Sequence, residues 1–409
     1  MARIVMKFGG TSVANLDRIR NAALRIKQEY DAGNHISVVV SAMAGVTNDL
    51  VEKTTKAAKI ADLREYDTIV TSGEQVTAGL MAIVLQDMGI PARSWLGWQI
   101  PIETDDTPKA ARIQSIDPAG LIARMEENIV CVCAGFQGVS PKGRITSLGR
   151  SGSDTTAVAL AAALNAERCD IYTDVDGIFT TDPRIVPKAR KLDIVSHEEM
   201  LELASVGAKV LHVRSVELAM NHNVRVHVLN SFDNKPGTML VPEEEIVESH
   251  SVTGIALERN EAKVSVIGVP DKPGIAASIF VPIGALGINV DMIVQSISPD
   301  GMATDMTFTV ARTDMERTMK CLQDHRESIG YQNLHADDAV AKVSVVGTGM
   351  RSNAGVAQDT FRTLAEGGIN LQVISTSEIK ISVLISENYG ELAVRLLHEA
   401  FGLEEDPVQ

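Results

Sequence analysis

A lysine and two glycines stand close together near the start of the chain, in residues 7–12 (KFGGTS). Lys7 ends a short apolar run, and Gly9 and Gly10 precede a helical pattern. Glycines let backbone N–H groups approach an anion closely, a helix N-terminus adds partial positive charge, and the lysine adds a full one. This chemistry suits a phosphate, although a glycine pair before a helix is also typical of a simple tight turn. In a P-loop the lysine follows the glycines, so this is a different pattern.

Two further polar segments have the composition of ligand-binding loops. Residues 148–156 (LGRSGSDTT) place Arg150 in a Gly/Ser loop ahead of an alanine-rich helical run, with Ser153 or Asp154 as the expected N-cap. Residues 171–184 (IYTDVDGIFTTDPR) predict a buried strand that ends in an acidic loop with glycine and proline. Ligands bind at strand ends in α/β sheets, so both segments are candidates for one site.

The elements that must position these loops alternate between helix and strand. Apolar residues three or four apart predict an amphipathic helix over 13–32, and a continuous apolar strand follows over 36–42. Strand, helix and strand in this order predict a mostly parallel sheet covered by helices. Glu74 begins a helical run over 76–88, where a carboxylate complements the helix dipole or accepts a substrate ammonium. Residues 95–106 are predicted to be irregular.

The chain then continues to an acidic linker. Ser196 and Glu199 form a capping box that predicts a helix over 197–211, with Lys209 near its C-terminal end. A lysine there is often only a complement to the helix dipole. A strand is expected over 225–230, and residues 242–250 (PEEEIVESH) are the expected linker.

Past the linker the sequence repeats itself. Residues 262–266 (AKVSV) recur at 341–345, and residues 287–289 (GIN) recur at 368–370. Such self-similarity indicates two copies of one supersecondary unit, each reading strand, glycine turn, helix, two strands and a closing helix. The helices and second strands are expected over 276–286 and 304–311 in the first copy and over 356–366 and 380–385 in the second.

Composition limits the functions that the chain can have. Its 409 residues, 45% of them apolar, predict two or three domains. A formal charge of −15 argues against nucleic acid or an anionic membrane as the main partner. With no signal peptide and no run of about 18 apolar residues, a cytoplasmic protein is expected. Cys131 and Cys133 alternate along an apolar strand, which favours buried structural thiols over a zinc site or redox pair.

Together these motifs resemble the amino-acid kinase family, and in it the aspartate kinases. The resemblance runs over essentially the whole chain and includes residues 38–43 (VVVSAM), 71–74 (TSGE), 134–138 (AGFQG) and 207–211 (GAKVL). It implies an α/β fold with an amino-acid-kinase-type αβα sandwich and a mostly parallel sheet. Where the family commonly has Gly-Gly, this chain has Ser151 and Gly152.

The repeated half resembles paired ACT domains, which are ferredoxin-like βαββαβ modules that bind free amino acids. In the resembling family the two copies are interleaved, so residues 252–257 are expected to join the sheet of the second unit. The implied division is a kinase domain over 1–245, a linker and strand over 246–263, and ACT units over 264–337 and 338–409.

The reaction that the resemblance implies is ATP-dependent phosphorylation of the β-carboxylate of L-aspartate. A carboxylate is already ionised at neutral pH, so the site needs cations and positioning in place of a general base. Glu74 and Arg150 form a suitable pair for the ammonium and carboxylate of an α-amino acid. The expected catalytic residues are Lys7, Asp154 and Lys209, with Asp154 orienting the lysines.

By resemblance, Ser41, Thr47 and Ser153 complete the aspartate site. Mg²⁺ is expected to arrive with ATP, held largely by the phosphates, and no metal site on the protein is expected. The expected ATP-binding residues are Lys7, Gly9, Gly10, Thr173, Asp174, Phe179, Asp182, Arg184 and Lys209.

The ACT pair is expected to be a feedback sensor for lysine and/or threonine, end products of the aspartate pathway that also leads to methionine. The pair is also expected to form a homo-oligomer; dimerisation alone is the alternative role. The expected effector-binding residues are Asp271, Gly274, Ile275, Ala276, Asn289, Asp291, Gln295, Val356, Asn370 and Leu371.

Three other functions remain in view. A related kinase acting on N-acetylglutamate, glutamate or uridylate would share the Lys7 turn, but acetylated and nucleotide acceptors have no free ammonium for Glu74. An amino-acid sensor with an inactive kinase fold would be expected to lack Lys7, Arg150 or Asp154, and all three are present. A bifunctional kinase and dehydrogenase would need several hundred residues after the ACT pair.

Overall fold

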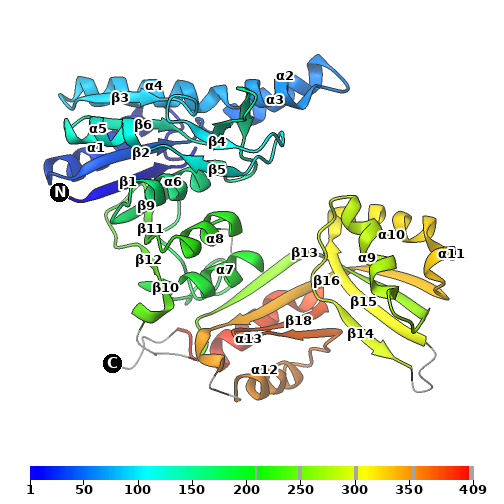
Figure 1. Ribbon diagram of the computed structural model, residues 1–409. Helices are drawn as coiled ribbons and strands as arrows, with labels where there is room; N and C mark the ends of the chain where they lie inside the picture. Colours follow the sequence, from blue (N-terminus) through cyan, green and yellow to red (C-terminus); the bar gives the residue numbers. More distant parts are fainter. Residues whose placement is uncertain (208–209, 247–250, 299–302, 352, 354, 405–409) are drawn as a thin grey trace. The chain divides into compact units, whose positions relative to one another are not determined.

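The computed structural model describes residues 1–207, 210–246, 251–298, 303–351, 353 and 355–404 (Figure 1). The chain divides into two compact units. The first comprises Met1–Ile178, Lys191–Ala204 and Lys209–Val247. The second comprises Phe179–Arg190, Ser205–Ala208 and Glu248–Gln409.

The first unit is built on an eight-stranded sheet in the order β10-β12-β11-β9-β1-β2-β6-β3. Neighbouring strands run parallel, except that β11 and β12 are antiparallel. The central strands are buried apolar runs, as expected for a sheet covered on both faces. The strands are β1 Arg3–Phe8, β2 His35–Val40, β3 Ala92–Trp95, β6 Val130–Ala134, β9 Arg168–Thr173, β10 Ile194–Ser196, β11 Val226–Asn230 and β12 Thr238–Val241.

Helices pack on this sheet, with α1 against α4 and α6 against α8. The predicted start of the first helix was wrong: α1 begins at Leu16, because the Asn15 side chain caps it by accepting from the backbone N–H of Arg18 at 3.0 Å. The helices are α1 Leu16–Asp31, α2 Val46–Ala57, α3 Leu63–Val70, α4 Ser72–Asp87, α5 Ala119–Glu126, α6 Gly152–Ala163, α7 His197–Ser205 and α8 Val213–Asn221.

Two other local predictions need correction. The capping box of Ser196 and Glu199 is present, with reciprocal hydrogen bonds of 3.1 and 3.3 Å, but α7 ends at Ser205 instead of continuing to 211. Residues 95–106 are not wholly irregular, because β4 lies within them and joins a small sheet in the order β5-β4-β7-β8. The strands of this sheet are β4 Ile102–Thr104, β5 Ile113–Ile116, β7 Gln137–Val139 and β8 Ile145–Ser147.

In the second unit the two sequence copies share one antiparallel sheet, in the order β14-β15-β13-β16-β18-β17. The long strands β13 and β16 belong to both halves: Gly254–Glu258 pairs with Lys342–Val346, and Val264–Ile267 pairs with Asn333–Ala336. The strands are β13 Gly254–Pro270, β14 Val294–Ile297, β15 Ala303–Ala311, β16 Asn333–Val346, β17 Val373–Thr376 and β18 Lys380–Ser386. The helices are α9 Ile275–Ala285, α10 Met315–Asp324, α11 Arg326–Ile329, α12 Gly355–Glu366 and α13 Gly390–Ala400.

A segment that follows β9 along the chain, Phe179–Arg190, packs in the second unit. Val186 belongs to the same core as Val345 and Leu397. The hydroxyl of Thr180 lies 2.9 Å from Nε2 of His398, which is buried on α13. Three of the expected nucleotide residues are therefore carried by the unit that contains the ACT repeats.

Burial explains two features of composition. All four cysteines are buried and free, as the sequence indicates for structural thiols. The stretch Leu63–Asp87, which covers α3 and α4, is long and apolar enough to cross a membrane by length and composition. Half of its most apolar window is buried inside the protein, as is typical of a core helix.

Candidate active site

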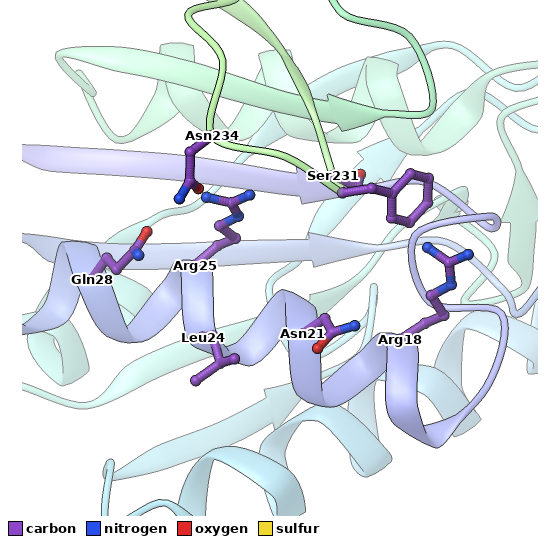
Figure 2. Close-up of a pocket in the computed structure, with 8 residues that line it drawn as sticks. Arg18, Asn21, Leu24, Arg25, Gln28, Ser231 and Asn234 are labelled. Carbon is purple, nitrogen blue, oxygen red and sulfur yellow. The ribbon is translucent and has the colours of Figure 1, made fainter.

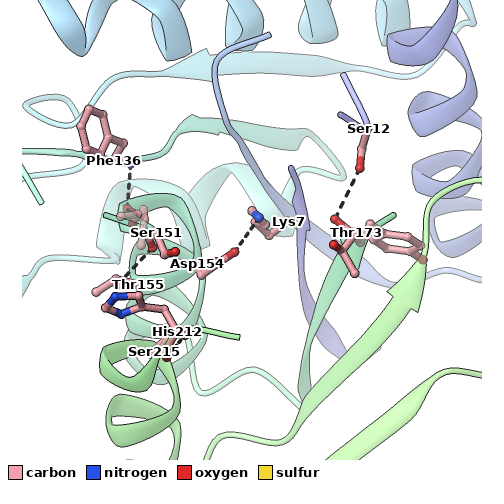
Figure 3. Close-up of polar contacts among 12 residues, drawn as sticks. Lys7, Ser12, Phe136, Ser151, Asp154, Thr155, Thr173, His212 and Ser215 are labelled. Carbon is pink, nitrogen blue, oxygen red and sulfur yellow. Dashed lines mark hydrogen bonds and ion pairs between the residues drawn. The ribbon is translucent and has the colours of Figure 1, made fainter. Parts of the chain in front are cut away.

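A cleft of about 760 Å³ in the first unit brings together the N-terminal glycine turn and the Arg150 loop. Figure 3 shows part of it, with Lys7 on β1 directed toward the start of α6. Nine of the expected catalytic, nucleotide and substrate residues line this cleft: Lys7, Gly9, Gly10, Ser41, Thr47, Glu74, Arg150, Ser153 and Asp154.

Lys7 and Asp154 form a buried ion pair at the base of the cleft. Lys7 lies next to the end of β1, between Val39 of β2 and Ile171 of β9. Its Nζ atom is 2.5 Å from Oδ1 of Asp154, and the two side chains are only 10% and 13% exposed. Because few other conformations are open to a buried, paired ammonium, Asp154 fixes the position of the Lys7 charge.

The glycine turn after β1 is packed against the ends of both neighbouring strands. The N–H of Gly9 donates to the carbonyl of Tyr172 on β9 at 3.3 Å. A Cβ atom at Gly10 would lie 3.0 Å from the carbonyl oxygen of Ala42, so a larger residue would push the turn away from the end of β2. The turn therefore needs glycine for close backbone approach.

The Arg150 loop is held in a conformation that few residues favour. Ser151 has φ +53°, in the left-handed region, which explains why glycine suits this position better than the serine of this chain. A Cβ atom at Gly152 would lie 2.7 Å from the ring of Phe136. The predicted N-cap was wrong: α6 begins at Gly152 after Ser151, so Ser153 and Asp154 lie inside its first turn.

Glu74 is a buried carboxylate that faces the cleft from the first turn of α4. Only 3% of the residue is exposed, and its Oε2 atom has no hydrogen-bond partner among the described residues. Burial raises the pKa of Glu74 to about 7, although the backbone N–H groups of Ala42 and Glu74 act to lower it. A positively charged ligand group would restore the ionised form.

Arg150 faces the same cleft as an exposed cation. Its guanidinium forms no ion pair with a carboxylate in the described part of the chain. The loop before it is fixed by Arg214, which donates to the carbonyls of Leu148 and Ala111 at 2.6 and 2.7 Å. Arg150 thus presents its guanidinium to the cleft from a firmly held backbone.

The expected nucleotide residues are only partly gathered. Thr173 ends β9 beside the glycine turn, and its carbonyl accepts from Ser231, whose hydroxyl lies 2.5 Å from that of Ser12. Asp174 follows it and is exposed. Neither Thr173 nor Asp174 lines the cleft. Lys209 lies outside the described residues. Phe179, Asp182 and Arg184 belong to the second unit, where Arg184 pairs with Asp182 at 2.7 Å.

The expected effector residues all lie in the second unit. Gly274 caps α9 with φ +91°, and Asp271, Ala276, Asn289 and Gln295 are exposed. In the second copy Val356 is buried, Leu371 is partly buried and Asn370 is exposed.

Asp291 is not a free acceptor. Its carboxylate is 2.5 Å from the ammonium of Lys342, which also lies 2.5 Å from Glu261. Burial acts to raise the pKa of Asp291, but Lys342 more than offsets this effect, and the pKa is lowered.

Sequence reasoning missed several residues of the site, among them Tyr66, Asp67 and Lys109. Tyr66 and Lys109 line the cleft, and the buried Asp67 holds the loop that carries Lys109. The only sequence signal for Asp67 is a carboxylate within an otherwise amphipathic helix, and Lys109 has none.

A second cavity of about 360 Å³ lies between α1 and the loop after β11 (Figure 2). Arg18 and Arg25 line it from the same face of α1, and Arg18 stacks on the ring of Phe232 at 3.9 Å. None of the expected site residues lines this cavity, so the larger cleft is the candidate active site.

Comparison with known proteins agrees with this geometry. The profile of the amino acid kinase family matches residues 2–230, and ACT domain profiles match 264–327 and 343–401. The aspartate kinase of Pseudomonas putida is 51% identical over 405 residues, covering 99% of this chain and 98% of that protein. The aspartokinase of Mycobacterium tuberculosis is 46% identical over 411 residues, covering 99% and 97%. The chain therefore belongs to the amino acid kinase family, and in it to the aspartate kinases with two ACT domains.

Solved structures give the same result. Aspartokinase III of E. coli in complex with aspartate and ADP matches with a TM-score of 0.82 at 27% identity, covering 98% of this chain and 99% of that one. The complex of that enzyme with lysine and aspartate matches with a TM-score of 0.75. The predicted fold class, an αβα kinase domain with ACT units, is confirmed.

Proposed function

We propose that the chain transfers the γ-phosphoryl group of ATP to the β-carboxylate of L-aspartate, forming 4-phospho-L-aspartate and ADP. The observation that carries this proposal is Glu74, a buried carboxylate facing the cleft with an unpartnered oxygen atom. Arg150, without a described carboxylate partner, lines the same cleft. An α-amino acid supplies an ammonium for Glu74 and a carboxylate for Arg150, whose planar fork binds it bidentately.

The reaction needs positioning and charge neutralisation. Since the β-carboxylate is ionised at neutral pH, no general base is required to activate it. Lys7 stabilises the negative charge on the transferring phosphoryl group, and Asp154 holds its ammonium in place. Ser41, Thr47 and Ser153 line the cleft where they bind and orient the amino acid.

The nucleotide enters as MgATP. The cleft carboxylates are Glu74 and Asp154, and Asp154 is paired with Lys7, so the phosphates carry most of the magnesium coordination. The N–H group of Gly10 approaches the phosphates, whereas that of Gly9 donates to the carbonyl of Tyr172. Within the first unit, Thr173 and Asp174 are the proposed contacts for the rest of the nucleotide, and Lys209 is the proposed second catalytic cation.

We further propose that the enzyme catalyses the first step of lysine, threonine and methionine biosynthesis in the cytoplasm and is inhibited by lysine and/or threonine. The E. coli relative was solved with lysine, which supports an amino-acid effector. Asp271, Asn289 and Gln295 are exposed, and their side chains suit the polar groups of such a ligand. Asp291 contributes to that site through the oxygen not paired with Lys342. Val356, Asn370 and Leu371 are the counterparts in the second copy.

The oligomer that we propose pairs the ACT units of two copies. The edge strand β14 is exposed throughout. Ile297 at its end is 59% exposed, and Ile293 just before it is 54% exposed. An apolar edge strand is a ready surface for pairing. The proposed boundaries remain 1–245 for the kinase domain, 246–263 for the linker and strand, and 264–337 and 338–409 for the ACT units.

Product trapping tests the proposed reaction. Hydroxylamine converts an acyl phosphate to a hydroxamate, so incubation with ATP and L-aspartate should give aspartyl hydroxamate together with ADP. Glutamate, N-acetylglutamate and uridylate serve as competing acceptors. Product from N-acetylglutamate with none from aspartate would overturn the substrate assignment.

A further inference from the structure

Lys109 stands at one wall of the cleft in a backbone conformation that disfavours lysine. Its φ is +65°, in the left-handed region that glycine adopts readily and other residues rarely do. A side chain is retained in such a conformation only where its surroundings fix it, and such positions cluster at functional sites.

Asp67 fixes the Lys109 turn. This carboxylate on α3 is 1% exposed and accepts the backbone N–H of Lys109 at 3.1 and 3.2 Å. It also accepts from the backbone N–H and hydroxyl of Ser147, at 3.1 and 2.7 Å, at the end of β8. One buried acid therefore ties the Lys109 turn to the strand that leads into the Arg150 loop.

The two turns also touch directly. A Cβ atom at Gly149, which has φ +78°, would lie 2.9 Å from the carbonyl oxygen of Lys109. Gly149 immediately precedes Arg150, so Lys109 and Arg150 are two neighbouring cations on the wall of one cleft.

No carboxylate in the described part of the chain forms an ion pair with Lys109. Its ammonium lies over the ring of Tyr66, 4.2 Å from the centroid, and Tyr66 also lines the cleft. By contrast, Lys142 is paired with Asp106 at 2.5 Å and does not line the cleft. A cation held over an aromatic face keeps its charge available to an incoming anion.

We propose that Lys109 is a substrate-binding residue that acts with Arg150 on the α-carboxylate of the acidic amino acid. The inference rests on the proposed function, because it assumes that aspartate occupies this cleft. Lys109 also increases the local positive potential in a protein whose net charge is −15, and so favours capture of an anionic substrate.

Replacing Lys109 by glycine removes the ammonium but keeps a residue that readily adopts the left-handed backbone conformation of this turn. Lys109→Gly should raise the KM for aspartate about three- to tenfold at low salt, while the KM for MgATP changes by less than about twofold. The difference from wild type should shrink at about 0.5 M salt, because the charge is screened. The melting temperature should stay the same or rise, since glycine relieves the left-handed strain. Lys109→Arg should restore the KM, and Lys142→Ala is the matched control.

Each outcome decides the proposal. An unchanged KM for aspartate in Lys109→Gly overturns it, as does an equal rise in Lys142→Ala. A rise in both KM values together with a lower melting temperature shows that Lys109 is only structural. If the wild type forms no aspartyl hydroxamate, the proposed function fails and this inference fails with it. If the wild type is active and Lys109→Gly is indistinguishable from it, only this inference fails.

Discussion

Replacing Glu74 by glutamine removes the charge that the proposed site offers to the substrate ammonium and keeps the shape of the side chain. A hydrogen bond between charged groups is worth about 1.5–3 kcal/mol, so the KM for aspartate should rise about 10- to 150-fold. The KM for ATP should change little, because the proposed partner of Glu74 is the ammonium of aspartate. Initial rates from coupled ADP release give both constants.

The pH dependence follows from the pKa of Glu74, which is raised from 4.5 to about 7 in the free protein. Aspartate binds the ionised form, so kcat/KM for aspartate should fall about tenfold per pH unit below 7. Glu74→Gln has no such group and should lack this step, whereas Arg150→Lys should retain it.

The same pKa predicts an effect on stability. Between pH 4.5 and 7 the folded protein holds a proton on Glu74 that the unfolded chain has lost, so the free energy of unfolding falls as pH rises. The loss amounts to about 3 kcal/mol and is complete above pH 7. Without ligand, Glu74→Gln should therefore be more stable than wild type at pH 8 and lose this advantage toward pH 5.

The reasoning on Glu74 would be refuted if Glu74→Gln bound aspartate as wild type does at pH 8. It would also be refuted if this variant kept the acid step in kcat/KM.

Four further substitutions separate the roles of the remaining groups. Arg150→Ala should weaken aspartate binding about 10- to 150-fold and leave the KM for ATP nearly unchanged. A loss of ATP affinity with aspartate affinity intact would show that Arg150 does not belong to the substrate site. Lys7→Ala should depress kcat more than either KM, because its charge matters most as the phosphoryl group moves; an unchanged kcat would contradict this. Asp271→Ala and Asn289→Ala should relieve inhibition by millimolar lysine and threonine and keep basal activity, as rate measurements with and without effector would show; inhibition equal to that of wild type would refute the effector site.

Local sequence rules were enough to find the two loops of the cleft. Lys7 and Arg150 stand beside glycines that allow close backbone approach, and this signal needs no knowledge of distant residues. Helix ends were less predictable, because the capping side chain of Asn15 overrides the apolar spacing that continues back to Val13.

Contacts between distant residues could not be predicted. Asp67 binds Lys109, 42 residues away, and Ser147, 80 residues away, and no periodicity in the chain records either contact. In the second unit the repeat indicated two similar copies, but local patterns do not specify that β13 and β16 extend through both halves of one sheet. The buried pair of Glu261 on β13 and Lys342 on β16 arises from that shared sheet.

The central claim is that the cleft recognises a free α-ammonium through Glu74 and phosphorylates the β-carboxylate of the same molecule. The most direct measurement compares hydroxamate formation from L-aspartate and from N-acetyl-L-aspartate at pH 8 with saturating MgATP. The acetylated compound keeps both carboxylates and lacks only the ammonium. Aspartate should give hydroxamate and N-acetyl-aspartate almost none, whereas comparable product from both would contradict the claim.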